Sequence, residues 1–71
     1  MKRGKYRPYK GKQYEVVDIA KNTENLEDYV VYKALYDNEV SKMWIRKKDN
    51  FNETVVVDGK GIPRFSFVSD K

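Results

Sequence analysis

Apolar and polar residues alternate along the chain in short runs that are separated by turn-forming residues. This pattern predicts extended strands rather than helices. The clearest strand covers residues 29–36, and its predicted core face carries Val30, Tyr32, Ala34 and Tyr36. Further extended segments are predicted at residues 5–10, 14–20, 40–46, 54–57 and 64–68.

Turn signals connect these segments and leave little room for helix. Residues 37–38 (Asp-Asn) predict a hairpin turn, and residues 58–61 (Asp-Gly-Lys-Gly) predict a reverse turn that joins 54–57 to 64–68. The polar segment 22–28 has room for one short helical turn at most. Five to six short strands predict a mainly β fold, either a small antiparallel β-barrel or a strongly bent sheet. An SH3-like barrel is the first choice, because closure removes exposed strand edges.

Alternation and β propensity also predict the core. The residues expected inside are Val16, Val30, Tyr32, Ile45, Val55, Phe65 and Phe67. In residues 14–20, Val16 is expected on one face and Ile19 on the opposite face. Because Pro8 cannot donate a hydrogen bond to a sheet ladder, residues 5–10 are predicted to form an edge strand or a bent strand.

The length of 71 residues allows one domain, residues 1–71, with one small core. No cysteine is present, so no disulfide reinforces the domain. Its 14% aromatic content compensates in part, because each aromatic side chain buries a large area. The apolar runs are far too short to span a membrane, and the basic first residues are not followed by the apolar stretch of a signal peptide. A cytoplasmic location is therefore expected.

The net charge of +4 is unevenly distributed. Residues 1–12 contain six basic residues and no acidic one, whereas the remainder contains nine basic and eleven acidic residues. The basic character is thus set by one segment and not by the domain as a whole. A uniformly basic surface would indicate a nucleic-acid binder, and a single basic segment is a weaker signal.

The residue types that are missing exclude most catalytic chemistry. Without histidine and cysteine, the chain lacks the usual proton shuttle, thiol nucleophiles and the common zinc ligands. Its four glycines lie in tail or turn contexts and form no phosphate-binding loop. Glu24, Glu27 and Asp28 are close in sequence, but their spacing matches no cation-binding loop. We therefore expect no enzyme activity, no metal and no cofactor.

One strand carries the best candidate for a binding surface. Strict alternation places Lys42, Trp44 and Arg46 on the face opposite Met43 and Ile45. If Met43 and Ile45 point into the core, Trp44 is exposed between two cations and can stack on a base or contact a peptide. Tyr6 and Arg7 extend this candidate surface. The alternative is that the single tryptophan belongs to the core, which is the more common position in a small domain.

Several short motifs, read in order, resemble one known family. They are Gly4-Lys5-Tyr6-Arg7, Gly11-Lys12-Gln13-Tyr14-Glu15-Val16, Val30-Val31-Tyr32, Ala34-Leu35-Tyr36, Trp44-Ile45-Arg46, Phe51 and Pro63-Arg64-Phe65. From about Gly4 to Phe67 the chain resembles domain-of-unknown-function family 1653, a family of short bacterial proteins. The resemblance implies a bacterial, stand-alone, cytoplasmic β domain and transfers no site. Pro8 and Asn22 stand where relatives often carry histidine, and Lys47 stands where a proline is common.

Two functions remain open from the sequence. The first is a non-catalytic module that binds a protein or a peptide through the aromatic surface around Trp44. The second is binding of RNA or single strands, with Lys5, Arg7, Lys42, Arg46 and Lys47 on phosphates and with Tyr6 or Trp44 stacked on bases. The first is favoured, because the charge outside residues 1–12 is net negative. No membrane partner is expected, and the chain is expected to be a monomer or a weak homodimer.

Overall fold

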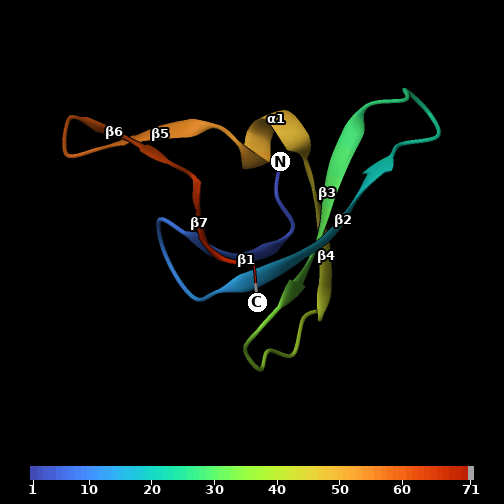
Figure 1. Cartoon of the computed structure of the whole chain (residues 1–71), viewed down its shortest axis with the longest axis horizontal. Coiled ribbons are helices and arrows are strands. Elements are labelled where there is room, and N and C mark those ends of the chain that lie inside the picture. The colour runs from blue at the N-terminus through green and yellow to red at the C-terminus, as the bar shows by residue number, and fades with distance from the viewer. Residues whose placement is uncertain (71) are drawn as a thin grey trace.

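The computed structural model describes residues 1–70 and shows a mainly β protein with two antiparallel sheets (Figure 1). Its elements are β1 (Gly4–Pro8), β2 (Tyr14–Lys21), β3 (Asp28–Ala34), β4 (Met43–Lys47), α1 (Lys48–Phe51), β5 (Thr54–Val57), β6 (Lys60–Pro63) and β7 (Phe65–Ser69). Five strands form one sheet in the order β4-β3-β2-β1-β7, and β5 and β6 form a separate hairpin.

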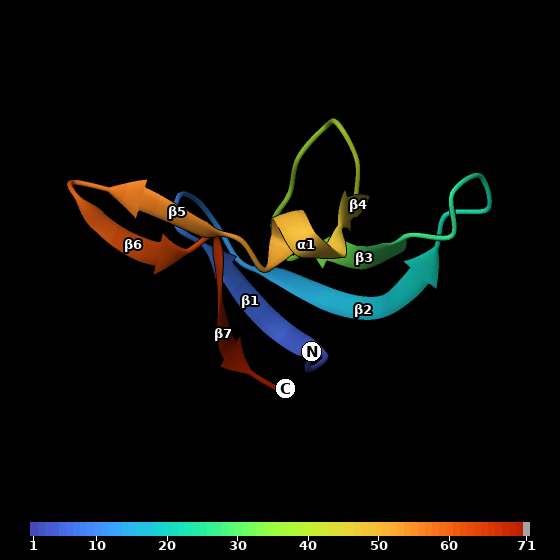
Figure 2. The ribbon, with the colours of Figure 1, turned by 90° about the horizontal axis from the view of Figure 1, so that it is seen from above.

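The predicted fold class is confirmed in its strongly bent form. The five-stranded sheet does not close into a barrel, because β4 and β7 at its two ends have no neighbour on their outer sides. The bend separates the β1–β7 part from the β2–β3–β4 part (Figure 2). One predicted connection was wrong: residues 60–61 do not form a turn that leads into β7. They begin β6, which pairs with β5 across a two-residue turn, and β7 instead pairs with β1.

A β-bulge in β2 changes the predicted faces of that strand. Val16 pairs with Tyr32 and Asp18 pairs with Val31, so Val17 is the extra residue. One extra residue shifts the alternation by one position. Ile19 therefore lies on the same face as Val16 and packs against the core, whereas it was predicted on the opposite face.

The core lies on one face of the five-stranded sheet, which we call the inner face, and α1 covers it. The buried side chains are Tyr6, Val16, Val30, Tyr32, Ala34, Phe51 and Phe65. Phe51 is the only core residue that comes from the covering element, and it is 1% exposed. Its ring stacks on Phe65 with centroids 4.0 Å apart and meets Tyr6 and Tyr32 edge-on. A single helical turn thus closes an aromatic core.

The face of β4 that points toward the core is the opposite of the predicted one. Trp44 pairs with Tyr32 and Arg46 pairs with Val30, and directly paired residues share a face of the sheet. Trp44 and Arg46 therefore face inward, and Ile45 is 66% exposed instead of buried. Two other predicted core residues also differ. Phe67 lies at the edge of the core and is exposed, and Val55 is only half-buried, in the separate hairpin.

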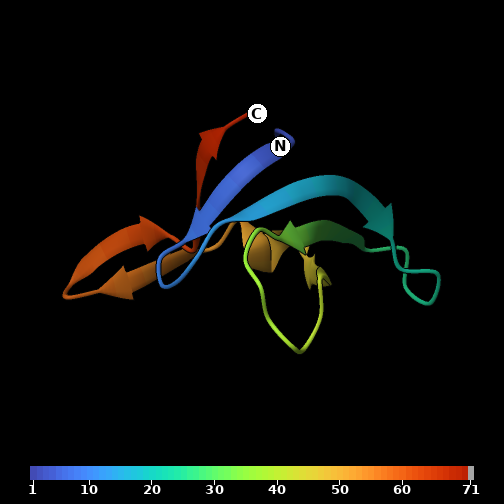
Figure 3. The same cartoon turned by 90° about the horizontal axis from the view of Figure 1, so that it is seen from below.

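The β1–β7 pair brings the first and last described segments together (Figure 3). β1 is not the edge strand that Pro8 suggested, since β2 and β7 flank it. Its pairing with β7 is irregular between Lys5 and Tyr6 and not at Pro8, which pairs with Phe65. At the start of β1, Gly4 has φ +133° and lies directly against the backbone of Ser69. Only glycine fits this approach without strain.

The short helical turn lies elsewhere than the sequence suggested. Residues 22–27 connect β2 to β3 in a turn stabilised by the side chains of Asn22 and Asn25, which accept hydrogen bonds from the backbone N–H groups of Glu24 and Glu27. The helical turn is α1, directly after β4. Within residues 1–70, no helix is long and apolar enough to cross a membrane.

Candidate functional site

The outer face of the β2–β3–β4 region carries apolar side chains where a solvated sheet face is normally polar. Strand register places Ile45 beside Val31, and it places Ala20 beside Tyr29 on the same face. We call these residues together with the exposed Met43 the outer patch: Ala20, Tyr29, Val31, Met43 and Ile45. A hollow of about 140 Å³ lies between Ala20, Tyr29 and Ile45. The patch offers an apolar surface that the folded chain itself does not cover.

Ion pairs border the outer patch on three sides. Lys33 binds Glu15 at 3.3 Å near Met43, and Lys47 binds Glu27 at 3.2 Å at the other end of β4. On the β2 side, Asp18 lies opposite Val31 and binds Arg3 at 2.8 Å. An apolar centre with a charged rim is the usual composition of a protein interface.

The fourth side of the patch is the free edge of β4. The Ala34 N–H donates to the carbonyl of Lys42, which fixes the hydrogen-bonding phase of the β3–β4 ladder. Hydrogen-bonded and non-hydrogen-bonded pairs alternate in an antiparallel ladder. Ile45 therefore turns its N–H and C=O away from β3, toward the open edge. An extended chain can pair with this edge by main-chain hydrogen bonds.

The surface predicted from the sequence is split between the two faces of the sheet. Tyr6 is buried in the core, and its hydroxyl donates to the carbonyl of Lys2 at 2.6 Å. Arg7 and Lys42 are exposed, but Trp44 is half-buried and packs against the core. The structure therefore brings Trp44 and Arg46 together on the inner face, and it does not join them to Tyr6 and Arg7 in one exposed surface.

Arg46 has a structural role at the margin of the core. Its guanidinium donates to the side-chain carbonyl of Asn50 at 2.6 Å, and it lies 5.6 Å from the centroid of the Phe65 ring. Asn50 in turn donates to Glu53, which forms an ion pair with Arg64 at 3.2 Å. This chain of contacts holds α1 against the sheet and so positions Phe51. Arg46 is therefore not free to bind phosphate.

Tyrosine hydroxyls gather at the other end of the core. The hydroxyls of Tyr14 and Tyr36 share a short hydrogen bond. Burial is the main cause that raises the pKa of Tyr14 to about 12, and the hydrogen bond to Tyr36 contributes. Because Tyr14 remains a neutral hydroxyl at neutral pH, it is suited to hold the β2–β3 end together rather than to act as a base.

This raised pKa predicts a loss of stability in alkali. A group whose pKa is higher in the folded state stabilises the fold below its unfolded pKa, which for tyrosine is about 10. The free energy of unfolding should therefore fall as the pH rises from about 10 to about 12. Urea denaturation at several pH values measures this fall. It should be smaller in Tyr14→Phe than in Tyr9→Phe, because Tyr9 is exposed.

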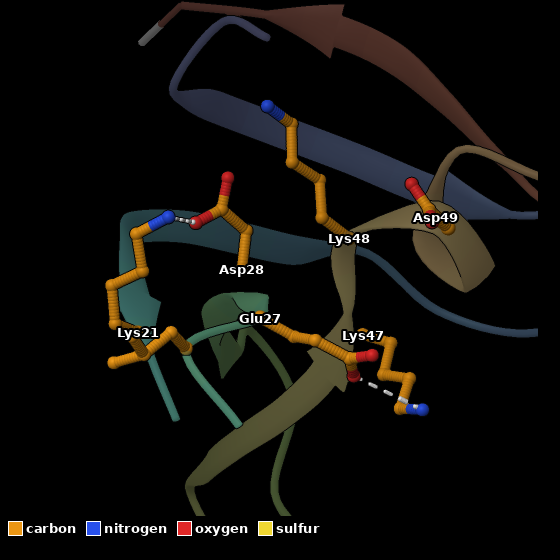
Figure 4. Close-up of a pocket in the computed structure, with 7 residues that line it drawn as sticks. Lys21, Glu27, Asp28, Lys47, Lys48 and Asp49 are labelled. Carbon is orange, nitrogen blue, oxygen red and sulfur yellow. Dashed lines mark ion pairs between the residues drawn. The ribbon is translucent and has the colours of Figure 1, made fainter. Parts of the chain in front are cut away.

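A cleft of about 390 Å³ opens between the β2–β3 turn and the start of α1 (Figure 4). Its charged groups largely neutralise one another: Lys21 binds Asp28 at 2.7 Å, and Lys47 binds Glu27. The ion pair with Lys21 holds the pKa of the Asp28 carboxyl below its usual value. Glu27 and Asp28 thus have ammonium partners instead of a cation site, and the residues described contain no metal-ligating cluster.

A separate cationic surface lies on β1 and the turn that follows it. It consists of Lys5, Arg7, Lys10 and Lys12, which we call the basic surface. In the described part of the chain, no carboxylate forms an ion pair with any of them. The exposed ring of Tyr9 has the Lys10 ammonium 5.8 Å from its centroid. Sequence reasoning found the cations, but it chose the buried Tyr6 instead of Tyr9 as their aromatic neighbour.

These features define the chain as a small bent-sheet domain with a free strand edge and an uncovered apolar face. Residues 4–67 match the model of DUF1653, a protein family of unknown function, and the chain belongs to this family. It is similar to the crystal structure of a DUF1653 protein from Bordetella bronchiseptica, with 35% sequence identity and a TM-score of 0.92. The match covers 100% of this chain and 91% of that one. No curated protein shows significant similarity to the chain.

Proposed function

We propose that this protein is a non-catalytic interaction module of the bacterial cytoplasm that binds an extended segment of a partner protein along β4. The observation that carries the proposal is the exposure of Ile45. This residue lies in the middle of an edge strand, is 66% exposed and belongs to the apolar outer patch. Main-chain pairing with the free edge would supply affinity, and contacts with the patch would supply specificity. The site thus shifts from Trp44 to the other face of the same strand.

Site-specific photo-crosslinking in the host cell tests the proposal. A photoreactive amino acid replaces Ile45 and, in a matched control, Val56, which is 76% exposed on the separate hairpin. We expect an adduct of one defined mass from position 45 and none of that mass from position 56. Equal labelling from both positions, or an adduct of two copies of this chain, would contradict the proposal.

Nucleic-acid binding is the second candidate function, and the basic surface favours it. Four cations without an ion pair in the described chain lie on β1 and the turn that follows it, and one of them, Lys10, has its ammonium 5.8 Å from the centroid of the exposed Tyr9 ring. Cations beside an exposed aromatic ring suit a single strand. Because Tyr6 and Trp44 are not exposed aromatic platforms, the site would be limited to Arg7, Tyr9 and their neighbouring lysines.

Salt dependence tests this second function. If the basic surface binds labelled single-stranded RNA, the fluorescence anisotropy signal should fall steeply between about 50 and 200 mM salt, because phosphate contacts release counterions. Arg7→Ala should weaken such binding and reduce its salt dependence, whereas Lys60→Ala on β6 should not. Absence of binding at the lower salt concentration would exclude the second function.

A further inference from the structure

The charge along β4 indicates the chemistry of the partner segment, an inference that rests on the function proposed above. Residues 42–48 contain four basic residues and no acidic one. Lys47 forms an ion pair with Glu27, and Arg46 bonds to a neutral amide. The charge of Lys48 acts on Asp28 and helps to lower the pKa of that carboxyl, but the two groups form no ion pair. The ammonium groups of Lys42 and Lys48, just beyond the two ends of β4, form no ion pair with any described residue. The positive charge without an ion pair therefore lies just beyond the two ends of β4, at Lys42 and Lys48.

The two cations at the α1 end of β4 point in different directions. Lys47 turns toward Glu27, while Lys48 extends the opposite way over the cleft beside Asp28 (Figure 4). Lys42 is exposed at the other end, directly before Met43. A chain that pairs with β4 would thus pass the apolar side chain of Ile45 in its middle and an unpaired ammonium near each end.

A second copy of this chain fits the edge poorly. Antiparallel pairing of two β4 strands about a twofold axis at Ile45 would bring Lys42 of one copy, directly before its β4, close to Lys48 of the other, directly after its β4. Like charges directly opposite one another destabilise strand pairing, and lysines on an edge strand discourage self-association. The same cations favour a partner of opposite charge.

We infer that β4 binds an extended segment in which apolar and acidic residues alternate. Successive side chains of a strand point to opposite faces. The apolar side chains of such a segment would lie on the outer face beside Met43 and Ile45. Its carboxylates would lie near the ammonium groups of Lys42 and Lys48, at the two ends of β4.

Fluorescence anisotropy with two labelled model peptides tests this inference on the full chain. One peptide alternates valine with glutamate, and the other alternates valine with lysine. We expect the glutamate peptide to bind and the lysine peptide to bind at least about tenfold more weakly. Equal affinities for both peptides would overturn the inference.

A matched pair of charge reversals locates the effect. Lys42→Glu and Lys60→Glu change the net charge equally, but Lys60 lies on the separate hairpin. Lys42→Glu should weaken binding of the glutamate peptide about fivefold, which is about 1 kcal/mol, and Lys60→Glu should change it less than about twofold. Equal weakening by both variants would show only a net-charge effect and would overturn the inference.

Removing the apolar contact separates this inference from the proposed function. Ile45→Ser should abolish binding of the glutamate peptide, whereas Val56→Ser, at another exposed position, should not. If both peptides bind equally and Ile45→Ser abolishes both, the acidic preference is wrong and the β4 docking site stands. If binding does not depend on Ile45, both the inference and the docking site are contradicted.

Discussion

Phe51→Ala should remove most of the stability of the domain. Phe51 is 1% exposed and contacts three core rings, those of Phe65, Tyr6 and Tyr32. Truncation of a buried phenylalanine costs about 3–5 kcal/mol. A domain of 71 residues has only roughly 4–10 kcal/mol of total stability. Urea denaturation at room temperature should show a midpoint far below that of the parent protein, or no folded state.

A matched control is available for this substitution. Val56→Ala truncates an apolar residue that is 76% exposed, and it should cost less than about 1 kcal/mol. If Phe51→Ala unfolded at the same urea concentration as Val56→Ala, α1 would not close the core, and the fold described here would be wrong.

Gly4→Ala should detach β1 from β7. A Cβ atom at this position would lie 2.4 Å from the Ser69 carbonyl oxygen and 2.8 Å from the Asp70 Cα. Both are backbone atoms and cannot rotate away. Backbone strain at φ +133° adds to this clash. Together they should cost on the order of 4 kcal/mol, measured as a lower midpoint of thermal or urea unfolding.

Gly59→Ala isolates the backbone contribution to that cost. Gly59 has φ +77°, and a Cβ atom there would meet nothing within 4 Å. Only the left-handed conformation is penalised, at about 1–2 kcal/mol. Equal losses from both substitutions would mean that the close approach between Gly4 and Ser69 is absent.

The alternation in β3 predicted its core face correctly, because one face is apolar without interruption: Val30, Tyr32 and Ala34 are all buried. The same strand also contained the signal for the outer patch. Tyr29 and Val31 make its second face apolar as well, so both faces needed a partner.

The phase of β4 could not be predicted from its own residues. Met43 and Ile45 favour burial of their face of β4, whereas Trp44 favours burial of the opposite face. The charge of Arg46 argues against burial of the Trp44 face, which is the face that the structure buries. Contacts between segments decide the phase. Trp44 packs beside Tyr32, and the guanidinium of Arg46 donates a hydrogen bond to the side-chain carbonyl of Asn50. The helical turn that supplies Asn50 has no periodic pattern, so this partner was not visible in the sequence.

Two other differences have equally local causes. Val16 and Val17 are both suited to a buried position, so the sequence does not reveal which of them the bulge in β2 leaves as the extra residue. Phe51 is a single apolar residue in a polar stretch, and no alternation marks it as core. A lone aromatic residue between polar neighbours was the one available sign in the sequence that residues 48–51 pack against the core.

Hydrogen exchange at the Ile45 amide tests the central claim that β4 is a docking edge most directly. The measurement compares the protein alone with its complex with the partner recovered through the crosslink at position 45. The Ile45 N–H should exchange rapidly in the free protein and become protected in the complex, because it then donates to the added strand. The Val56 amide on the separate hairpin should not change. An Ile45 amide that exchanges equally fast in both states would show that the partner does not pair with β4, which would contradict the account.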